Sequence, residues 1–242
     1  MTSRQSLFLF VVHRGGSIFL HDKLAAPLAR DLNLMCADLG TYLFKYPPSK
    51  ASPYLASPRG RFYSKIYVPL FPFIRVPRGC RAACVIRDPR DVAVSTYYSL
   101  AYSHPLLPGE SLENRVARQT RMREMGLARW LQQEGLPVAG MELRAALKLA
   151  KGTQTHLFKY EDMVTRWGYF LRGILNWLRV PGKFATKYLP LAAEFESKGE
   201  GILSHKRQVA PGNWKTVLTP DLVRLGEEVF GSHLLEAGYH WD

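Results

Sequence analysis

The sequence has few cysteines and no long hydrophobic run. Its 242 residues include only Cys36, Cys80 and Cys84, an odd number without a paired framework, which favours free thiols in a reducing compartment. The apolar run at 7–12 is too short for a signal-peptide core or a membrane span, and no other run approaches the required length. We therefore expect a cytoplasmic protein that does not span a membrane.

Two chemical signatures are also missing. No pair of histidines or cysteines has the spacing of a zinc site, so we expect no bound metal. The glycine-containing segment after the first apolar run lacks the Gly-Lys-Ser or Gly-Lys-Thr ending of a Walker A loop. This absence argues against an ATPase or a kinase.

Apolar residues and positive charge, in contrast, are plentiful. Hydrophobic residues make up 47% of the chain and aromatic residues 12%, which is enough for a packed core, and the length suits one domain spanning 1–242. The formal net charge of +13 indicates an anionic partner: a nucleotide, a nucleic acid, a sulfated glycan or an acidic membrane. Composition alone does not choose among these partners.

Short apolar runs alternate with amphipathic segments along the chain. Strands are expected at 7–12, 33–37, 64–68, 81–87 and 155–159. Helices are expected at 17–31, 89–100, 112–133, 141–149, 163–178 and 220–230, and loops at 46–61 and 198–213. This alternation predicts a three-layer α/β fold, a parallel sheet with helices on both faces. Ligands of such sheets bind at the carboxyl ends of the strands.

Arg14-Gly15-Gly16-Ser17 follows the first expected strand and is a candidate anion site. The glycines allow backbone N–H groups to turn inward, and the N-terminus of the following helix adds a partial positive charge. The Arg14 guanidinium and the Ser17 hydroxyl supply side-chain donors. An ordinary turn with two glycines explains the segment equally well.

A second candidate anion site begins at Arg87, where another apolar strand ends. Asp88 is expected to cap the next helix, with Pro89 in its first turn. Ser95 follows Arg87 by eight residues, about two helical turns, so the two side chains can grip a phosphate from two sides. The capping pattern explains the start of the helix but not the choice of arginine and serine.

Two further segments are less specific on their own. The basic triplet at 205–207 precedes Gly-Asn-Trp-Lys at 212–215, and such triplets often belong to a solvated surface. The segment at 158–163 runs from a strand end into a helix, where an acidic N-cap is a common explanation.

Together the four segments resemble the sulfotransferase family that uses 3′-phosphoadenosine 5′-phosphosulfate (PAPS). Residues 13–19 stand where that family has the loop that holds the 5′-phosphosulfate. Residues 87–95 match its Arg-x-Pro-x-Asp-x-x-x-Ser segment in full, and 160–163 match Tyr-Glu-Asp-Met. The resemblance spans roughly 7–219 and implies a P-loop-NTPase-like sulfotransferase fold.

The resemblance also implies a role for each matching residue. Arg14 replaces the lysine that stabilises the bridging oxygen of the leaving phosphate. Contacts to the 5′-phosphate would come from Gly15, Gly16, Ser17 and Ile18. The adenine would be held by Phe19, in place of a stacking tryptophan, and by Tyr160. The 3′-phosphate would be bound by Arg87, Ser95, Lys206 and Arg207.

Several positions depart from the family pattern. Arg14 keeps the charge of the lysine but has no tunable proton to donate. The loop at 16–18 has lost one of two usual hydroxyls, and the basic loop is two residues longer before the tryptophan. The second difference leaves the assignment within 205–207 open. Pro220 interrupts a dimerisation signature, and the oligomeric state is left open.

The general base has three candidates. In the family's cytosolic members it is a histidine in a strand, and Tyr67 occupies that position here, although a tyrosine with a pKa of about 10 is a poor base at neutral pH. Branches that act on sugars or protein tyrosines use an acid after the second strand, where this chain has Asp38. We prefer Asp38 as base and Tyr67 as a substrate contact, with His21 as a third candidate.

The sequence thus predicts an enzyme that moves a sulfuryl group from PAPS to a hydroxyl of a small-molecule acceptor by in-line transfer, without metal. The products would be the sulfated acceptor and adenosine 3′,5′-bisphosphate (PAP). An aromatic or anionic acceptor is expected, in a pocket lined by Tyr42, Phe44, Tyr67, Tyr97, Tyr98, Tyr102 and His104. The alternative functions are a kinase or other phosphate-transfer enzyme and a non-enzymatic polyanion-binding module. No nucleic-acid partner is expected.

Overall fold

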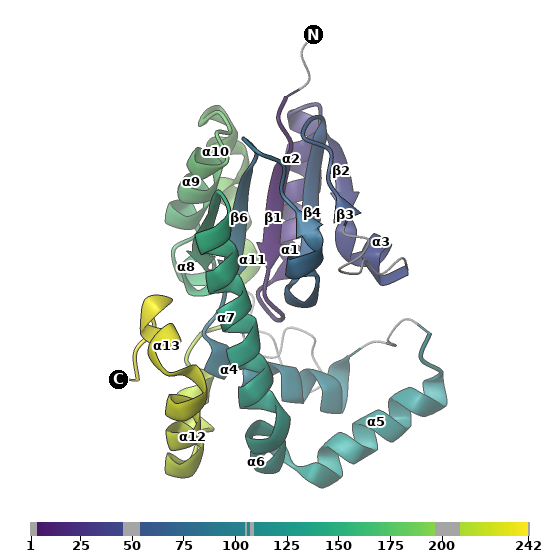
Figure 1. Cartoon of the computed structure of the whole chain (residues 1–242), viewed down its shortest axis with the longest axis vertical. Helices are drawn as coiled ribbons and strands as arrows, with labels where there is room; N and C mark the ends of the chain where they lie inside the picture. Colours follow the sequence, from purple (N-terminus) through teal and green to yellow (C-terminus); the bar gives the residue numbers. More distant parts are fainter. Residues whose placement is uncertain (1–3, 46–53, 105, 107–108, 197–208, 242) are drawn as a thin grey trace. The chain divides into compact units, whose positions relative to one another are not determined.

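The computed structural model describes residues 4–45, 54–104, 106, 109–196 and 209–241 (Figure 1). The chain forms two compact units. The first unit contains 1–86 and 145–194, and the second contains 87–144 and 195–242. The prediction that 1–242 act as one domain stays a prediction.

The first unit is built on five parallel strands in the order β2-β4-β1-β6-β7 (Figure 1). Their bounds are Leu7–Val11 for β1, Met35–Asp38 for β2, Arg61–Tyr67 for β4, Arg81–Ile86 for β6 and Thr155–Lys159 for β7. Every residue of β1 is buried, as expected for a central strand covered on both faces. A separate parallel pair joins β3 (Tyr54–Leu55) to β5 (Ile74–Arg75). The predicted α/β class with a parallel sheet is confirmed.

An irregularity in β4 sets the position of its C-terminal end. Phe8 of β1 pairs with Tyr63, but Phe10 pairs with Ile66, so β4 holds one extra residue between these pairs. Lys65 lies in this stretch with a φ of 51°, the left-handed conformation that β-bulges use. The bulge brings Tyr67, the last residue of β4, opposite Val11, the last residue of β1.

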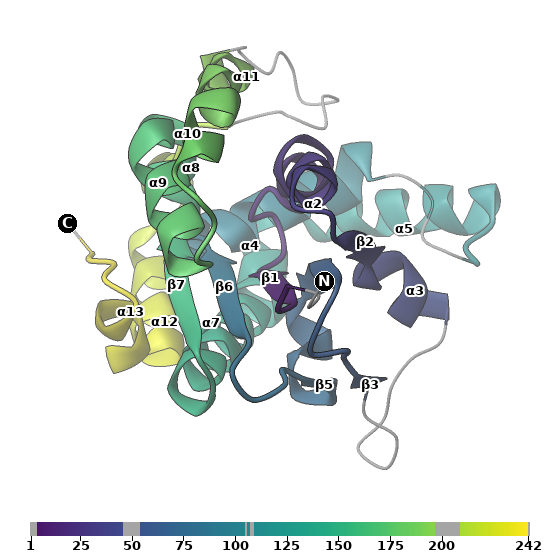
Figure 2. The ribbon, with the colours of Figure 1, turned by 90° about the horizontal axis from the view of Figure 1, so that it is seen from above.

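Helices flank the sheet of the first unit (Figure 2). A continuous run of α1 (Ser17–Phe19), the π-helix η1 (Leu20–Ala25) and α2 (Ala26–Asp31) confirms the predicted helix at 17–31. The others are α3 (Leu39–Lys45), η2 (Val68–Phe73), α8 (Tyr160–Thr165), α9 (Trp167–Trp177), α10 (Lys183–Tyr188) and η5 (Leu189–Ala192). Figure 2 shows α2 and α9 on one side of the sheet and the C-terminal turns of α7 (Leu136–Gly152) on the other.

Trp177 fixes α9 to the sheet. Its indole Nε1 donates a 2.8 Å hydrogen bond to the carbonyl of Ala82 in β6. The guanidinium of Arg81 lies 4.7 Å above the indole and donates to the Trp177 carbonyl at 3.0 Å. The single helix predicted at 163–178 is two helices, because Arg166 leaves the helical conformation with a φ of −138°.

The second unit is helical. Its elements are α4 (Pro89–Tyr98), the π-helix η3 (Ser99–Ser103), α5 (Leu112–Met125), α6 (Leu127–Trp130), the π-helix η4 (Leu131–Gly135), the N-terminal part of α7, η6 (Asn213–Thr216), α12 (Pro220–Phe230) and α13 (Ser232–Glu236). A short helix α11 (Ala193–Glu196) spans the boundary between the units. The helix predicted at 112–133 ends early because Gly126 adopts a φ of 76°.

A buried arginine organises the core of the second unit. Arg90 is 2% exposed and donates two hydrogen bonds to the carboxylate of Asp88, at 2.9 and 2.6 Å. Its guanidinium lies 3.7 Å from the ring centre of Trp214 and 4.6 Å from that of Trp241. These cation–π contacts join the start of α4 to the C-terminal end of the chain. Asp88 also accepts a hydrogen bond from the Arg90 amide, which confirms the predicted cap.

The compartment predictions concern thiols and membrane spans. Cys36, Cys80 and Cys84 are all free thiols. Within the described ranges, no helix combines the length and the apolar composition needed to cross a bilayer. The cytoplasmic location stays a prediction.

Candidate functional site

The loop after β1 has an alternating backbone that suits an anion. Arg14 has a φ of 59° and Gly16 a φ of 81°, both in the left-handed region, while Gly15 between them does not. Alternation of this kind turns successive N–H groups to one side and forms a concave anion-binding nest. A non-glycine residue in this region stores about 1–2 kcal/mol of strain, and such strain gathers at functional sites.

Both glycines of this loop are needed for space. A Cβ on Gly15 would lie 2.9 Å from a methyl carbon of Val11 and 3.0 Å from the carbonyl oxygen of Val12. A Cβ on Gly16 would lie 2.7 Å from Cε of Met163 and 3.5 Å from the ring of Tyr160. Gly15 therefore has no room for a side chain against Val11 and Val12, and Gly16 is favoured by its left-handed backbone. The donors of this loop, backbone amides beside an arginine, fit a phosphate.

Two predicted adenine contacts lie on elements that adjoin this loop. Tyr160 is the first residue of α8, is buried, and has its ring close to Gly16. Phe19 ends α1 and packs edge-to-face on Trp167, with ring centres 5.6 Å apart. The structure thus brings the loop and Tyr160 together. Met163 and Trp167 are neighbours that the sequence reasoning missed, although the aromatic share of 163–178 was a signal.

Tyr67 links β4 to the loop. Its hydroxyl lies 3.1 Å from Oγ of Ser17. The imidazole of His13 stacks on its ring, with centres 5.6 Å apart and an angle of 6° between the planes. A Cβ on Gly40 would lie 2.7 Å from the same ring, so the glycine of α3 makes room for it. Tyr67 is thus held from several directions beside the candidate anion site.

Asp38, the preferred base, has a full set of partners. It accepts hydrogen bonds from the amide and the hydroxyl of Thr41, both at 3.0 Å, and pairs with Nζ of Lys65 at 2.9 Å. Burial alone would raise the pKa of Asp38, but the Thr41 amide and the Lys65 ammonium outweigh it and hold that pKa below its usual value. A carboxylate with a lowered pKa is a weaker base, and the role of Asp38 as general base stays a prediction.

His21 lies on η1 and faces β4. Its Nδ1 lies 2.6 Å from Oγ of Ser64, which is completely buried. Burial lowers the pKa of His21, and the charge of Lys65 lowers it further. Nε2 of His21 is 4.0 Å from the carboxylate of Asp22. The His21 side chain therefore joins η1 to β4 in the packing of the first unit.

Arg87 and Ser95 lie where the sequence predicts them. Arg87 directly follows β6, the strand that pairs with β1, and is 5% exposed. Ser95 is in the second turn of α4 and half-buried. The helix begins directly after the Asp88 cap, so the partial positive charge of its first turn lies at Pro89–Asp91. Their common role as a phosphate grip stays a prediction.

Asp91 tethers the segment that follows the basic loop. Its carboxylate accepts hydrogen bonds from the amide of Gly212 at 2.7 Å and from the amide of Trp214 at 3.0 Å. Asp91 is 1% exposed and lies in the first turn of α4, between Arg87 and Ser95. Lys206 and Arg207 lie outside the described residues. The sequence reasoning treated Asp91 only as a helix-start residue and missed this tether.

The aromatic residues predicted for an acceptor pocket fall into separate groups. In the first unit, Tyr42 packs edge-to-face on Tyr54, with ring centres 6.0 Å apart. In the second unit, Tyr98 stacks on Tyr102, while Tyr97 is buried against Trp130. The side chain of Phe44 lies outside the described residues. Tyr97 is therefore explained by core packing.

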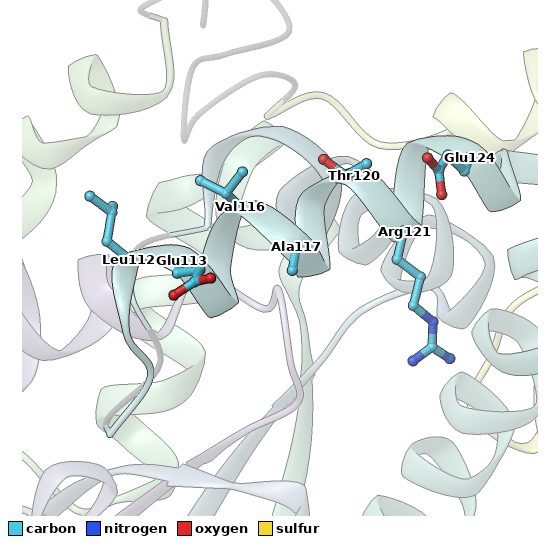
Figure 3. Close-up of a pocket in the computed structure, with 7 residues that line it drawn as sticks. All are labelled: Leu112, Glu113, Val116, Ala117, Thr120, Arg121 and Glu124. Carbon is cyan, nitrogen blue, oxygen red and sulfur yellow. The ribbon is translucent and has the colours of Figure 1, made fainter.

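A hollow of about 790 Å³ lies along α5 and not at the predicted site (Figure 3). Its lining residues are Leu112, Glu113, Val116, Ala117, Thr120, Arg121 and Glu124. All seven come from one helix, and they include two glutamates and an arginine, so the hollow is an open helix face of mixed polarity and not an enclosed cavity. No residue predicted for the site or the acceptor pocket is among them.

Among the described residues, no three histidine, cysteine, aspartate or glutamate side chains gather as metal ligands would. The expectation of a metal-free reaction stays a prediction.

Comparison with known proteins identifies the fold. No protein-family model and no curated protein matches the sequence. Among solved structures, mouse sulfotransferase SULT7A1 complexed with PAP aligns over 96% of this chain and 84% of its own, with 16% identity and a TM-score of 0.59. Retinol dehydratase in a complex with retinol and PAP aligns over 98% of this chain and 83% of its own, with 12% identity and a TM-score of 0.51. The chain therefore has the sulfotransferase fold, as its sequence motifs predict.

Proposed function

We propose that this protein is a PAPS-dependent sulfotransferase that sulfates a hydroxyl of a small-molecule acceptor. The observation that carries the proposal is the glycine cradle at 14–17, directly after the central strand of a sulfotransferase fold. The matching segment at 87–95 supports it from the second unit. PAP in the two similar structures named above suggests the same nucleotide here.

The residues of the first unit would serve the 5′ end of the nucleotide. When bound, PAPS would supply the sulfuryl group. The loop amides of Gly16 and Ser17 would bind the 5′-phosphate oxygens, because the Gly15 amide already donates a 3.1 Å hydrogen bond to the Val12 carbonyl. The Arg14 guanidinium would offset the charge that grows there during transfer. Ile18 adds a further amide, and Phe19 with Tyr160 would hold the adenine between aromatic faces.

The residues of the second unit would serve the 3′-phosphate. Arg87 offers a planar fork of donors that matches a phosphate, and Ser95 offers a hydroxyl. Lys206 and Arg207 would add charge, with Asp91 holding the end of their loop. The basic surplus of the chain serves the same multiply charged ligand.

The catalytic work of the chain in this proposal is positioning and charge stabilisation. In-line transfer of this kind needs little covalent chemistry from the protein. The acceptor is proposed to be a small hydroxyl compound, aromatic or anionic. Retinol in the dehydratase complex is a hydroxyl compound of small size, which is compatible with that class.

Heat protection by nucleotides tests the proposal. PAP should raise the melting temperature of the wild type, and ATP at the same concentration should raise it far less, because ATP lacks the 3′-phosphate. Arg87→Ala should lose the PAP effect, while removal of a surface charge by Arg224→Ala should leave it unchanged. Equal protection by ATP and PAP would favour a phosphate-transfer enzyme instead. If PAP does not raise the melting temperature, or if Arg87→Ala and Arg224→Ala reduce the PAP effect by the same small amount, a polyanion-binding module is favoured.

A transfer assay then tests the reaction. PAPS labelled in its sulfuryl group should pass the label to at least one member of a panel of phenols, sugars and alkyl alcohols. Arg14→Ala should reduce this transfer at least a hundredfold, because it removes the charge beside the leaving phosphate. A variant with full transfer would remove Arg14 from the mechanism.

A further inference from the structure

We propose that His13 is the general base of the transfer reaction, a role that rests on the proposed function. The residue lies between the last residues of β1 and Arg14, so it is covalently next to the group assigned to the leaving phosphate. It is half-buried, which leaves part of the imidazole accessible. Histidine is the side chain that most often takes protons near neutral pH.

The geometry around Tyr67 points to His13 as the base. The position that carries the base in cytosolic sulfotransferases holds Tyr67 here, and the His13 ring is stacked in an offset arrangement on that tyrosine, with ring centres 5.6 Å apart and planes 6° from parallel. Tyr67 is fixed by its contact with Ser17 and by the space at Gly40. The ring of Tyr67 therefore positions the imidazole of His13, which follows β1, close to the position of the histidine base in cytosolic sulfotransferases.

The other candidates are occupied elsewhere. The oxygens of Asp38 are taken by Thr41 and Lys65, and its lowered pKa makes it a weak base. Nδ1 of His21 is bound to the buried Ser64. Two ionisable side chains adjoin His13: Arg14, which follows it in the chain, and Tyr67, whose ring is stacked with the imidazole.

The step balances without a further reagent. The acceptor oxygen forms a bond to sulfur as the bond from sulfur to the phosphate oxygen breaks. The electron pair of the broken bond leaves with that phosphate, whose charge the Arg14 guanidinium offsets. The proton of the acceptor hydroxyl passes to a ring nitrogen of His13 and returns to water after the product leaves.

Acylation of histidines by diethylpyrocarbonate tests the placement without an activity assay. The reagent attacks neutral, accessible imidazoles, and mass spectrometry locates each adduct. His13 should be acylated in the free protein, faster as the pH rises from 5 to 8, and at least tenfold more slowly with PAPS bound. The exposed His240 should react equally with and without PAPS. An unreactive His13, or one that PAPS leaves unprotected, would overturn the proposal.

Kinetics with the acceptor found in the transfer panel test the role itself. His13→Gln should keep the wild-type affinity for PAP within threefold and lose 10²- to 10⁴-fold in kcat, the usual contribution of a general base. The acid limb of the wild-type pH profile should disappear, and free imidazole should restore part of the activity of His13→Ala. His240→Gln is the matched control.

Two results separate this inference from the proposed function. If His13→Gln keeps both kcat and the acid limb while Asp38→Asn loses them, the base is Asp38 and sulfuryl transfer stands. If the wild type does not bind PAP, the proposed function itself fails. Should His13→Gln unfold, the acylation experiment on the wild type still decides the placement.

Discussion

Replacing Asp91 by alanine should destabilise the protein more than any surface substitution of the same kind. The carboxylate is 1% exposed and accepts the amide hydrogens of Gly212 and Trp214, at 2.7 and 3.0 Å. Each hydrogen bond to a charged group contributes about 1.5–3 kcal/mol, and an amide left buried without an acceptor costs a similar amount. Loss of both bonds should therefore lower the free energy of unfolding by about 4 kcal/mol.

Thermal unfolding measures this loss. For a chain of this size each kcal/mol corresponds to about 2–4 °C, so Asp91→Ala should melt roughly 10 °C or more below the wild type. Asp91→Asn keeps one acceptor oxygen and should lose about half as much free energy. Asp221→Ala is the matched control, because Asp221 also lies in the first turn of a helix but is exposed and contacts only Arg224 there. It should change stability by less than about 0.5 kcal/mol.

The same variants report on the basic loop. If Asp91 positions the segment after Lys206 and Arg207, the affinity for PAP should fall about tenfold in Asp91→Ala, or about 1.4 kcal/mol. An Asp91→Ala protein that melts within 1 °C of the wild type would refute the tether. A large loss of stability with unchanged PAP affinity would keep the tether and refute its link to the nucleotide.

Other predictions concern the first unit. Gly16→Ala places a Cβ on a backbone with a φ of 81°, 2.7 Å from Cε of Met163. Calorimetry should show loss of PAP binding, and thermal melting should show a free energy of unfolding lower by about 1–2 kcal/mol. Arg14→Gly should relieve about 1 kcal/mol of left-handed strain, so the variant should melt no lower than the wild type while its transfer rate falls at least a hundredfold. The lowered pKa of Asp38 gives a contribution to stability that is present at neutral pH and lost as the pH falls through the folded-state pKa, which lies below the ordinary value of about 3.9. A denaturant series should therefore show Asp38→Asn less stable than the wild type at pH 7, with a difference that begins to shrink at about pH 3.9 and disappears only in stronger acid, below the folded-state pKa. The first prediction is contradicted if Gly16→Ala binds PAP like the wild type, and the second if Arg14→Gly melts at a lower temperature. The third is contradicted if the stability difference between Asp38→Asn and the wild type does not depend on pH.

Local pattern predicted much of the fold. The apolar runs at 7–12, 81–87 and 155–159 are β1, β6 and β7 to within one residue at either end, and the helix at 220–230 is α12 with its stated bounds. These elements are specified by short-range signals: continuous apolar residues, a cap or a proline in the first turn. Their order along the chain was enough to infer a parallel sheet.

Features that depend on distant parts of the chain could not be predicted. The bulge at Lys65 puts a lysine in a conformation that no pattern signals, and it shifts the register so that Tyr67 pairs with Val11. The contact between Asp91 and Gly212 joins residues 121 positions apart. The strand at Arg61–Tyr67 begins three residues before the predicted 64, because Phe62 and Tyr63 pair with Leu7 and Phe8 of β1.

The candidate site shows the same division. Motif and spacing predicted the loop at 14–19 and the position of Tyr160 beside it. The general base could not be derived in this way, because the contacts around its candidates join distant parts of the chain, as Tyr67 contacts Ser17 and His13. Asp38 had the right place in the sequence, yet Thr41 and Lys65 occupy its oxygens in the structure.

The central claim is that Arg87 binds the 3′-phosphate of the nucleotide and so selects PAP over nucleotides without that phosphate. Calorimetric titration of the wild type and of Arg87→Ala with PAP and with 5′-AMP, which lacks that phosphate, tests it most directly. The wild type should prefer PAP by about 100-fold or more, equivalent to roughly 2.7 kcal/mol, and the preference should shrink to tenfold or less in Arg87→Ala. A wild type that binds both nucleotides equally, or an Arg87→Ala variant that keeps the full preference, would contradict the account.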